Sequence, residues 1–486
     1  PLYTIMLLRL VWALFLFARP SEAFSAHPLV PTDIKLSKAS ASLMGQASSS
    51  SGEDVNEQQT VKKASRLAGF DAPTVWHEFT PLAKEHSACN LGQGFPDWPC
   101  PTFAKDAIKR AVDNDLNQYT RSGGHPALME VLAETYSPLL GRRLDPMTEV
   151  TAAVGASEAL FAAFQALLGP GDEAVLLEPA FDIYAAQVQM AGAKSVHVPL
   201  RPAPGGNWAL DPAELAAALT PRAKVLVLNT PHNPTGKVFT RAELEAIAEI
   251  VQRYPQLVVV TDEVYENILY GNAVHERMAT INGMWDRTLT ISSAGKTFSL
   301  TGWKVGWLIG PEPLIRAVME VNQWVQFSVP TPNQQAVADI LVEARRPYRG
   351  HPDFYAHLRA EYARKKEVLC AALVSAGITP LKVEGGIFVM GDTSSLEVPE
   401  KYTSKGTAAC PEMTRDWAFC RWLTIEKGVA AIPPSAFYCK EHKALAGNYA
   451  RFAICKTDET LEESTKRLQR VQVQSVVEQE DASIML

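Results

Sequence analysis

Short apolar runs rich in β-branched residues recur along the middle of the chain and predict strands. They begin at Ala174, Lys224, Leu257 and Thr288, and turn residues bound each of them. Runs of this kind suit strands that are buried on both faces of a mainly parallel sheet. The pattern therefore predicts a sheet whose strands are joined by helices.

Helical patterns separate these predicted strands. Apolar residues at helical spacing predict helices over residues 127–140 and 156–168. Asp211 and Thr240 each stand three residues before a glutamate, which is the arrangement that caps a helix at its N-terminus. The alternation of strands and helices predicts an α/β fold, with an α/β/α large domain around a mainly parallel sheet.

The pattern changes after about residue 345, where we expect a second, smaller α+β domain. A long charged helix is predicted over residues 355–375, and short strands follow near residues 386–390 and 449–455. The predicted parts of the chain are a targeting presequence (1–52), an N-terminal arm that packs with the small domain (65–100), a large domain (101–345), a small C-terminal domain (346–475) and a loose acidic tail (476–486).

The first 52 residues have the pattern of a targeting segment. An apolar run over residues 5–18, interrupted by Arg9, is typical of a secretory signal peptide and is shorter than a membrane-spanning helix. The following segment is rich in Ser and Ala, contains few acids and resembles a plastid transit peptide. We expect a plastid location, with secretion or another organelle as alternatives, and no stable membrane association once the presequence is removed.

Charge and cysteine content narrow the class of protein further. The chain has 46 Lys and Arg against 53 Asp and Glu, a net charge of −7, and no basic stripe, which argues against nucleic acid as its main partner. Its seven cysteines form no CxxC pair and show no histidine spacing typical of zinc sites. We therefore expect free thiols and no metal site.

The most informative segment contains Lys296. It follows directly after a predicted strand, within SSAGKTFSLTGWK, and so lies at the strand's carboxyl end, where open α/β sheets bind ligands. An amine in such a loop of small residues can reach into a cleft and condense with an aldehyde. Ser293 and Lys304 offer a hydroxyl and a cation for a phosphate. The alternative is a surface loop with two solvated lysines.

Three other segments end at the same predicted edge of the sheet. Asp262 ends one strand, and Tyr265 follows it, so that a carboxylate suited to a protonated pyridine nitrogen lies near a phenol. Asn233 lies in a rigid turn between X-Pro steps. Ala156 and Ser157 begin a helix, whose N–H groups can bind an anion. Taken singly, each segment is also explained by an ordinary turn or helix start.

These segments together resemble the fold-type I, class I/II aminotransferases, and within them the kynurenine aminotransferase, glutamine transaminase K and cysteine-S-conjugate β-lyase group. The resemblance runs from about Trp76 to Ile454. It rests on LGQGFPD, NQYTRSGG, EPAFDIY, NTPHNPTGK, TDEVYE, SSAGKTFSLTGWKVGW and NYARF, which occur in the family's order. It implies a pyridoxal 5′-phosphate (PLP) enzyme that moves an amino group from an L-amino acid of the kynurenine, glutamine, methionine or aromatic type to a 2-oxo acid.

The resemblance also implies a role for each matched residue. Lys296 is the Schiff-base lysine, Asp262 the partner of the pyridine nitrogen, and Asn233 and Tyr265 the ligands of the phenolic oxygen. The other cofactor ligands it implies are Phe181 on the ring, Ala156, Ser157, Ser293 and Lys304 at the phosphate, and Tyr119 at the phosphate of the neighbouring subunit of a homodimer. The substrate ligands it implies are Gly94, Asn233 and Arg451 at the α-carboxylate and Trp76 over the side chain.

Two positions depart from the animal kynurenine enzymes. Ser157 stands where they carry an aromatic residue, and Ser328 stands where they carry a histidine of the neighbouring subunit, so preference for kynurenine over other donors stays open. Two rival functions also stay open. One is a cysteine-S-conjugate β-lyase, which eliminates at Cβ, and the other is a non-catalytic dimeric binding protein with the same fold.

Overall fold

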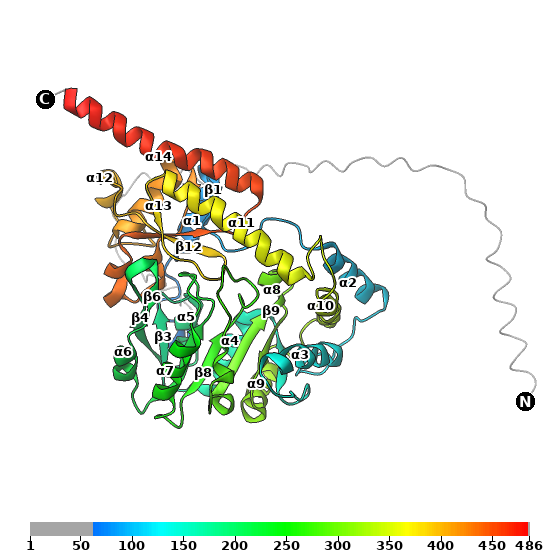
Figure 1. Ribbon diagram of the computed structural model, residues 1–486. Helices are drawn as coiled ribbons and strands as arrows, with labels where there is room; N and C mark the ends of the chain where they lie inside the picture. Colours follow the sequence, from blue (N-terminus) through cyan, green and yellow to red (C-terminus); the bar gives the residue numbers. More distant parts are fainter. Residues whose placement is uncertain (1–61, 485–486) are drawn as a thin grey trace, which may run out of the picture. The chain divides into compact units, whose positions relative to one another are not determined.

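A seven-stranded sheet forms the centre of the computed structural model, which describes residues 62–484 (Figure 1). Its strands, in order across the sheet, are β2 (Val150–Ala153), β10 (Gly306–Ile309), β9 (Thr288–Ser293), β8 (Val258–Asp262), β7 (Ala223–Asn229), β3 (Glu173–Glu178) and β4 (Lys194–Pro199). Strand β10 is antiparallel to both of its neighbours, whereas the pairs from β9 to β4 are parallel. The predicted α/β fold with a mainly parallel sheet is confirmed.

Both faces of the sheet are buried, which explains the continuous apolar runs. In β7, Leu226 and Leu228 pack into one hydrophobic cluster with helices α6 and α7, while Val225 and Val227 pack into another with α4, α5 and α9. Successive side chains of a strand point to opposite faces, so each strand needs apolar residues at every position.

Helices cover the two faces and one end of this sheet. They are α2 (Thr102–Asp113), α3 (Pro126–Leu139), α4 (Gly155–Leu167), α5 (Ile183–Met190), α6 (Pro212–Ala218), α7 (Arg241–Val251), α8 (Ala294–Thr297), α9 (Glu312–Val325) and α10 (Thr331–Glu343). The predicted caps are present. Thr240 forms a complete capping box with Glu243, and the Asp211 side chain accepts a hydrogen bond from Ala213 N.

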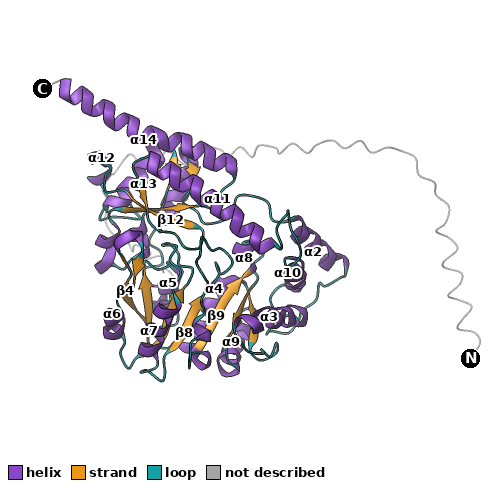
Figure 2. Cartoon of the chain, viewed as in Figure 1, coloured by secondary structure: helices purple, strands orange, loops and turns teal. Residues whose placement is uncertain are grey.

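A smaller group of helices and strands follows residue 345, and in it α11 and α14 lie side by side (Figure 2). An antiparallel sheet in the order β11-β12-β14 lies within this group. The elements are α11 (Phe354–Ser375), β11 (Thr379–Pro380), β12 (Phe388–Asp392), α12 (Glu400–Thr403), α13 (Arg415–Glu426), β13 (Val429–Ala430), β14 (Tyr449–Ala453) and α14 (Asp458–Ile484).

The N-terminal arm joins this second group. Helix α1 (Val75–Glu85) contacts α13, and the short strand β1 (Cys89–Asn90) pairs in parallel with β13. At the other end, α14 continues to Ile484, where we expected a loose tail from residue 476. The sequence there contains no Gly or Pro to end a helix. The predicted presequence lies outside the described residues.

Short elements complete the described chain. The two-residue strands β5 (Arg201–Pro202) and β6 (Trp208–Ala209) form a small antiparallel ribbon. The 3-10 helices are η1 (Ser65–Leu67), η2 (Pro204–Gly206), η3 (Met278–Thr280), η4 (Trp285–Arg287), η5 (Pro434–Phe437) and η6 (Lys440–Ala446).

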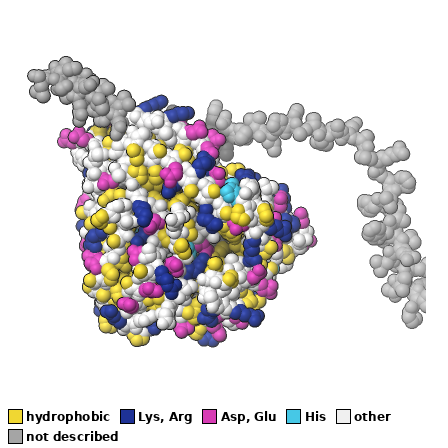
Figure 3. All heavy atoms as spheres, viewed as in Figure 1, with side chains coloured by type: hydrophobic (Ala, Val, Ile, Leu, Met, Phe, Trp, Pro, Cys, Tyr) yellow, Lys and Arg dark blue, Asp and Glu magenta, His cyan; other side chains and the backbone are white. Residues whose placement is uncertain are grey.

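The surface carries mixed charge. On the face shown in Figure 3, basic and acidic side chains are interspersed with apolar ones. Within residues 62–484, no helix combines the length and the apolar character that crossing a bilayer requires.

Candidate active site

A cavity of about 650 Å³ lies at the carboxyl ends of the parallel strands. Strands β7, β8 and β9 lead directly into residues that line it, as expected for a ligand site in an open α/β sheet. All but one of the predicted site residues line this cavity. They are Trp76, Gly94, Ala156, Ser157, Phe181, Asn233, Asp262, Tyr265, Ser293, Lys296, Lys304 and Arg451.

Lys296 projects from the four-residue helix α8, which follows β9. Its Nζ donates a 2.6 Å hydrogen bond to Gly94 O and lies 5.8 Å from the centre of the Tyr265 ring. Burial lowers the pKa of this ammonium group, and the charge of Arg451 lowers it further, against the influence of Cys455 and Asp262. A depressed pKa favours the neutral amine, which is the form that attacks a carbonyl carbon.

Asp262 ends β8 with its carboxylate buried. Tyr184 Oη donates to Oδ2 at 2.7 Å, and Val264 N donates to Oδ1 at 3.3 Å. Burial raises the pKa of Asp262, although the hydrogen bond from Tyr184 and the charge of Lys296 act in the opposite direction. The described residues give this carboxylate hydrogen bonds but no ion pair. A buried carboxylate of this kind favours a cationic partner inside the cavity.

Tyr265 and Asn233 reach the cavity from neighbouring strand ends. Burial raises the pKa of Tyr265, so its hydroxyl stays protonated and can donate. The turn that carries Asn233 is fixed by a 2.6 Å hydrogen bond from Asn233 N to Asn229 Oδ1. The Asn233 side chain is also held by Arg451, which donates to its Oδ1, and both Asn233 and Tyr265 line the cavity together with Asp262 and Lys296.

Arg451 lies on β14, and only 1% of its surface is exposed. Its guanidinium donates to Gly92 O at 2.7 Å and to Asn233 Oδ1 at 3.2 Å, while Nε has no hydrogen-bond partner among the described residues. Burial lowers its pKa to about 10, so it stays charged at neutral pH. A buried guanidinium without a carboxylate partner fits the carboxylate of a ligand.

Aromatic rings surround this guanidinium. Its central carbon lies 4.0 Å from the Phe388 ring centre, 4.8 Å from Phe437 and 5.5 Å from Trp76. Trp76 Nε1 also donates to Asp182 Oδ2 at 2.8 Å, which fixes the indole at the cavity wall. The rings exclude water from the Arg451 end and strengthen its electrostatic attraction for an anion.

The start of helix α4 forms a cradle for an anion in the same cavity. Gly155 begins helix α4 with φ +73°, and a Cβ there would lie 3.2 Å from both Cε and Nζ of Lys304. The glycine therefore lets the lysine approach the start of the helix, which no side chain caps. Ala156, Ser157 and Ser293 also line the cavity. Free N–H groups, a hydroxyl and an ammonium suit a phosphate.

Tyr119, the remaining predicted site residue, and Ser328, one of the two departures from the animal enzymes, do not line the cavity of this chain. Tyr119 is 83% exposed and packs edge-on against Phe327, with ring centres 5.2 Å apart. Ser328 Oγ donates to Val329 O at 3.2 Å and is likewise absent from the cavity lining. Tyr119 was predicted to act at the phosphate of a neighbouring subunit, and Ser328 stands where the animal kynurenine enzymes carry a histidine of the neighbouring subunit.

Sequence reasoning missed three polar groups of the cavity region. Tyr184, the partner of Asp262, lies one helical turn after Phe181 in EPAFDIY, so the spacing alone carried a signal. Asp182 in the same segment holds Trp76. Glu158 lies at the start of α4, where burial raises its pKa to about 7 despite a hydrogen bond from Val154 N.

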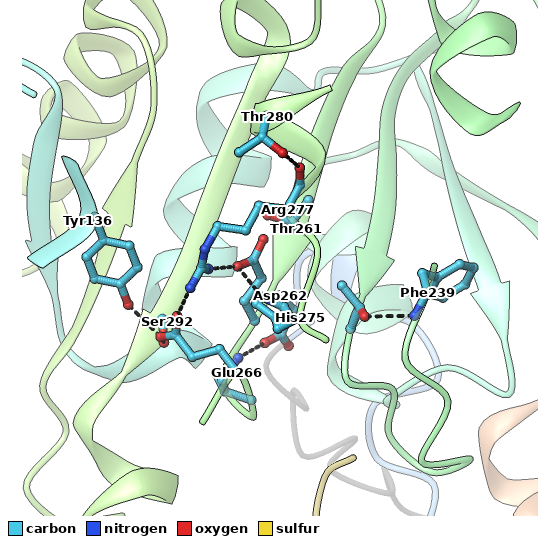
Figure 4. Close-up of polar contacts among 12 residues, drawn as sticks. Tyr136, Phe239, Thr261, Asp262, Glu266, His275, Arg277, Thr280 and Ser292 are labelled. Atoms are coloured by element: carbon cyan, nitrogen blue, oxygen red, sulfur yellow. Dashed lines mark hydrogen bonds and ion pairs between the residues drawn. The ribbon is translucent and has the colours of Figure 1, made fainter. Parts of the chain in front are cut away.

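A buried charge network supports the strands that carry the site (Figure 4). Arg277 pairs with Glu263 through NH1, and its NH2 lies 2.6 Å from Glu266 Oε2. Tyr136 Oη and Ser292 Oγ donate to Glu266 Oε1 at 2.5 Å and 2.6 Å. Glu263 follows Asp262 and Ser292 precedes Ser293, so this network fixes the backbone beneath the cavity.

The cavity fits PLP when its three polar regions are taken together. The anion cradle at α4 suits the phosphate, the buried carboxylate of Asp262 suits a protonated ring nitrogen, and the amine of Lys296 suits the aldehyde. Arg451 remains available for a second anion, such as the carboxylate of an amino acid. Fold and cavity together define an enzyme that transfers amino groups.

The chain belongs to the aminotransferase class I and II family, whose profile matches residues 87–468. Enzymes of this family are generally PLP-dependent and act on amino acids and 2-oxo acids.

Individual relatives agree with this assignment. The kynurenine--oxoglutarate transaminase of Dictyostelium discoideum is 43% identical over 424 residues, which cover 84% of this chain and 96% of the relative. The solved structure of Bna3p from Saccharomyces cerevisiae has a TM-score of 0.80 at 33% identity, covering 85% of this chain and 99% of that chain. For YbdL from Escherichia coli, identified as having a methionine aminotransferase function, the TM-score is 0.75 at 32% identity, with coverage of 85% and 100%.

Proposed function

We propose that this chain binds PLP covalently through Lys296 and transfers the amino group of L-kynurenine, or of a related aromatic or long-chain L-amino acid, to 2-oxoglutarate or a similar 2-oxo acid. The observation that carries the proposal is that Lys296 and Asp262 face one cavity, with the unpaired guanidinium of Arg451 in the same cavity. Relatives named for the kynurenine reaction support the donor and the acceptor.

The polar residues around the ring of the cofactor then have separate roles in the reaction. When bound, PLP supplies a conjugated ring that can accept the electrons of the substrate's Cα–H bond. Asp262 holds a proton at the ring nitrogen, and Tyr184 orients the carboxylate that does so. Tyr265 and Asn233 serve as ligands of the phenolic oxygen. The burial of these groups excludes water, which strengthens every charge interaction among them.

Arg451 positions the substrate, and Lys296 moves the proton. The guanidinium binds the α-carboxylate at two points, which fixes the direction of the Cα–H bond. The amine of Lys296, with its lowered pKa, takes the Cα proton as a general base and later returns it. Trp76, whose ring lies 5.5 Å from the Arg451 guanidinium and is held by Asp182, covers the substrate side chain.

The choice of amino donor depends on the departures at Ser157 and Ser328. A serine in place of an aromatic residue leaves more room near the cofactor, so a wider range of side chains is expected to enter. Kynurenine remains the proposed donor because the indole of Trp76 offers a flat apolar surface. Methionine, glutamine and phenylalanine are the competing donors.

We also propose a homodimer. Tyr119 is exposed beside the exposed Phe327, and a second subunit would bury both and bring Tyr119 to the neighbouring phosphate cradle. The plastid location proposed from the presequence is independent of this site. It is tested by imaging the full chain fused to a fluorescent protein, with a version lacking residues 1–52 as control.

The test of the reaction uses purified holoprotein and single L-amino acids without any oxo acid. A competent donor converts the bound cofactor to its amino form, so the absorption band above 400 nm disappears. Kynurenine is expected to do this, and addition of 2-oxoglutarate should restore the band. An S-conjugate that yields pyruvate without an acceptor would reveal β-lyase activity. A protein that shows no band above 400 nm and no conversion by any donor would contradict the proposal.

A further inference from the structure

A second group of metal-ligating side chains lies outside the cavity. Glu178 Oε2 lies 2.6 Å from His442 Nδ1 and 3.5 Å from Cys439 Sγ. Cys439 Sγ lies 3.4 Å from His442 Nδ1. A carboxylate oxygen, a thiol sulfur and an imidazole nitrogen therefore converge on one point, although Glu178 is 261 residues away from Cys439 in the chain.

We propose that Glu178, Cys439 and His442 form a binding site for a zinc-like divalent cation. Zinc prefers sulfur, nitrogen and carboxylate ligands in tetrahedral geometry, with bonds of about 2.3 Å to sulfur and about 2.0–2.1 Å to nitrogen and oxygen. These bonds place sulfur about 3.5 Å from each of the other two ligand atoms. Both sulfur separations already match, and the carboxylate and imidazole need to part by less than about 1 Å.

The carboxylate is already oriented for this role. Its other oxygen, Glu178 Oε1, accepts a hydrogen bond from Cys439 N and lies 2.9 Å from His197 Nδ1. Metal ligands are commonly held by such additional partners, which fix the direction of the remaining lone pairs. Glu178 Oε2 is thus the oxygen that faces Cys439 Sγ and His442 Nδ1.

Burial and access also suit a cation. The Glu178 side chain is 1% exposed, whereas that of His442 is 28% exposed, so the carboxylate lies inside and the imidazole leaves a path from solvent. Binding of the cation displaces the thiol proton of Cys439 to solvent and forms a metal–thiolate bond. Water completes the coordination.

The other cluster of this type differs in one respect. Glu263, Glu266 and His275 also bring three potential ligand atoms together. The guanidinium of Arg277 already pairs with both of these carboxylates, so that cluster has its cation in the protein itself (Figure 4). No Lys or Arg ion pair to Glu178 is found in the part of the chain that the structure describes.

A cation at this site would connect two distant parts of the chain near the substrate. Glu178 ends β3, and two residues later Ala180 N donates to Phe437 O at 2.8 Å. The Phe437 ring lies 4.8 Å from the Arg451 guanidinium, and Cys439 follows two residues after it. The cation is thus expected to stabilise the wall beside Arg451 without touching the cavity itself.

Metal content of the holoenzyme tests the site. The PLP-loaded enzyme is treated with a chelator, incubated with Zn²⁺, desalted and analysed for metal. Wild type should retain one zinc ion per chain, and its thermal unfolding should shift upward with added Zn²⁺ because the ion binds only the folded state. Co²⁺ in place of Zn²⁺ should give visible bands typical of tetrahedral cobalt with a thiolate ligand.

Matched variants identify the ligands. Cys439→Ser and His442→Gln should lose the ion, whereas Cys370→Ser and Glu441→Gln, which change a free thiol elsewhere and a carboxylate of the same turn, should keep it. Circular dichroism and cofactor absorbance report whether each variant folds. A wild type that retains no zinc, or a folded Cys439→Ser variant that retains as much as Cys370→Ser, would overturn the proposal. Neither result bears on transamination.

Discussion

Lys296 Nζ donates a 2.6 Å hydrogen bond to the carbonyl oxygen of Gly94, 202 residues earlier in the chain. Gly94 follows β1, which pairs with β13, so the amine on the large sheet is held by the backbone of the N-terminal arm. A Cβ at position 94 would collide with the Phe388 ring, and the backbone approaches this closely only because the residue is glycine. Correct placement of the amine therefore depends on both groups of elements.

Loss of the charge at Asp262 should slow the reaction far more than it weakens cofactor binding. We expect Asp262→Asn to lower kcat by about two to four orders of magnitude, because removal of one member of a buried pair costs about 3–5 kcal/mol. Tyr184→Phe removes only the neutral hydrogen bond to Oδ2, worth about 1 kcal/mol, and should lower kcat less than tenfold. Equal losses in the two variants would contradict the role given to the carboxylate.

Replacement of the Arg451 fork by a point charge should weaken substrate binding. Arg451→Lys is expected to lower kcat/KM for amino acids about 10–100-fold, mainly through KM, because a charged hydrogen bond of about 1.5–3 kcal/mol is lost. The cofactor's absorption should stay unchanged. Arg364→Lys, which alters an exposed pair with Asp458, is the control and should behave as wild type. An unchanged KM in Arg451→Lys would exclude the carboxylate contact.

The anion cradle can be tested through its glycine. Gly155→Ala places a Cβ 3.2 Å from Lys304 Nζ and imposes φ +73° on a residue with a side chain, a strain of about 1–2 kcal/mol. PLP affinity, measured by equilibrium titration of the apoprotein, should fall about tenfold or more. In Gly302→Ala the new Cβ meets nothing within 4 Å, and affinity should hold. A Gly155→Ala protein with wild-type affinity would place the phosphate elsewhere.

The buried network around Arg277 should make stability depend on acid pH. Burial disfavours the charged form of Glu263, yet Arg277 and His275 outweigh it and hold the pKa of Glu263 below its usual 4.5. A lowered pKa stabilises the fold above about pH 4.5, and this contribution is lost as pH falls through the folded-state value. The free energy of unfolding, from urea titrations at several pH values, should therefore decline below about pH 4.5.

Replacing Arg277, the cation at the centre of this network, provides a variant that tests the same pH dependence. Arg277→Met should be less stable at neutral pH by about 3–5 kcal/mol, with the difference from wild type shrinking in acid as Glu263 becomes protonated. Arg346→Met breaks only an exposed pair with Glu343 and should change stability by less than about 1 kcal/mol. A constant difference across the pH range would mean that Arg277 acts through packing alone.

The sequence predicts most of the large sheet because its strands are apolar on both faces and end in short polar segments. Three site residues lie at or just after such strand ends, namely Asn233, Asp262 and Lys296. Their proximity could therefore be predicted from the parallel arrangement of the strands. Strand β10 was not predicted, since it is only four residues long, begins inside the motif that contains Lys296 and runs antiparallel to both neighbours.

Contacts between segments that are far apart in the chain could not be predicted from the sequence. Nothing local pairs Gly94 with Lys296, and Glu178 meets His442 only because the turn after η5 folds back onto the end of β3. The sequence predicts free thiols and no metal site because, of the other two proposed metal ligands, only His442 lies near Cys439 in the chain, three residues later. Such pairings depend on tertiary packing, which periodicity and motif spacing do not encode.

The most direct test of the central claim is to find which lysine carries the cofactor. Holoprotein is reduced with borohydride, which fixes the link between PLP and its lysine, and is then digested and analysed by peptide mass spectrometry. We predict the added mass on Lys296, and its absence in a folded Lys296→Ala variant. An adduct on Lys304 or on another lysine, or no adduct in a protein that still transaminates, would contradict the account.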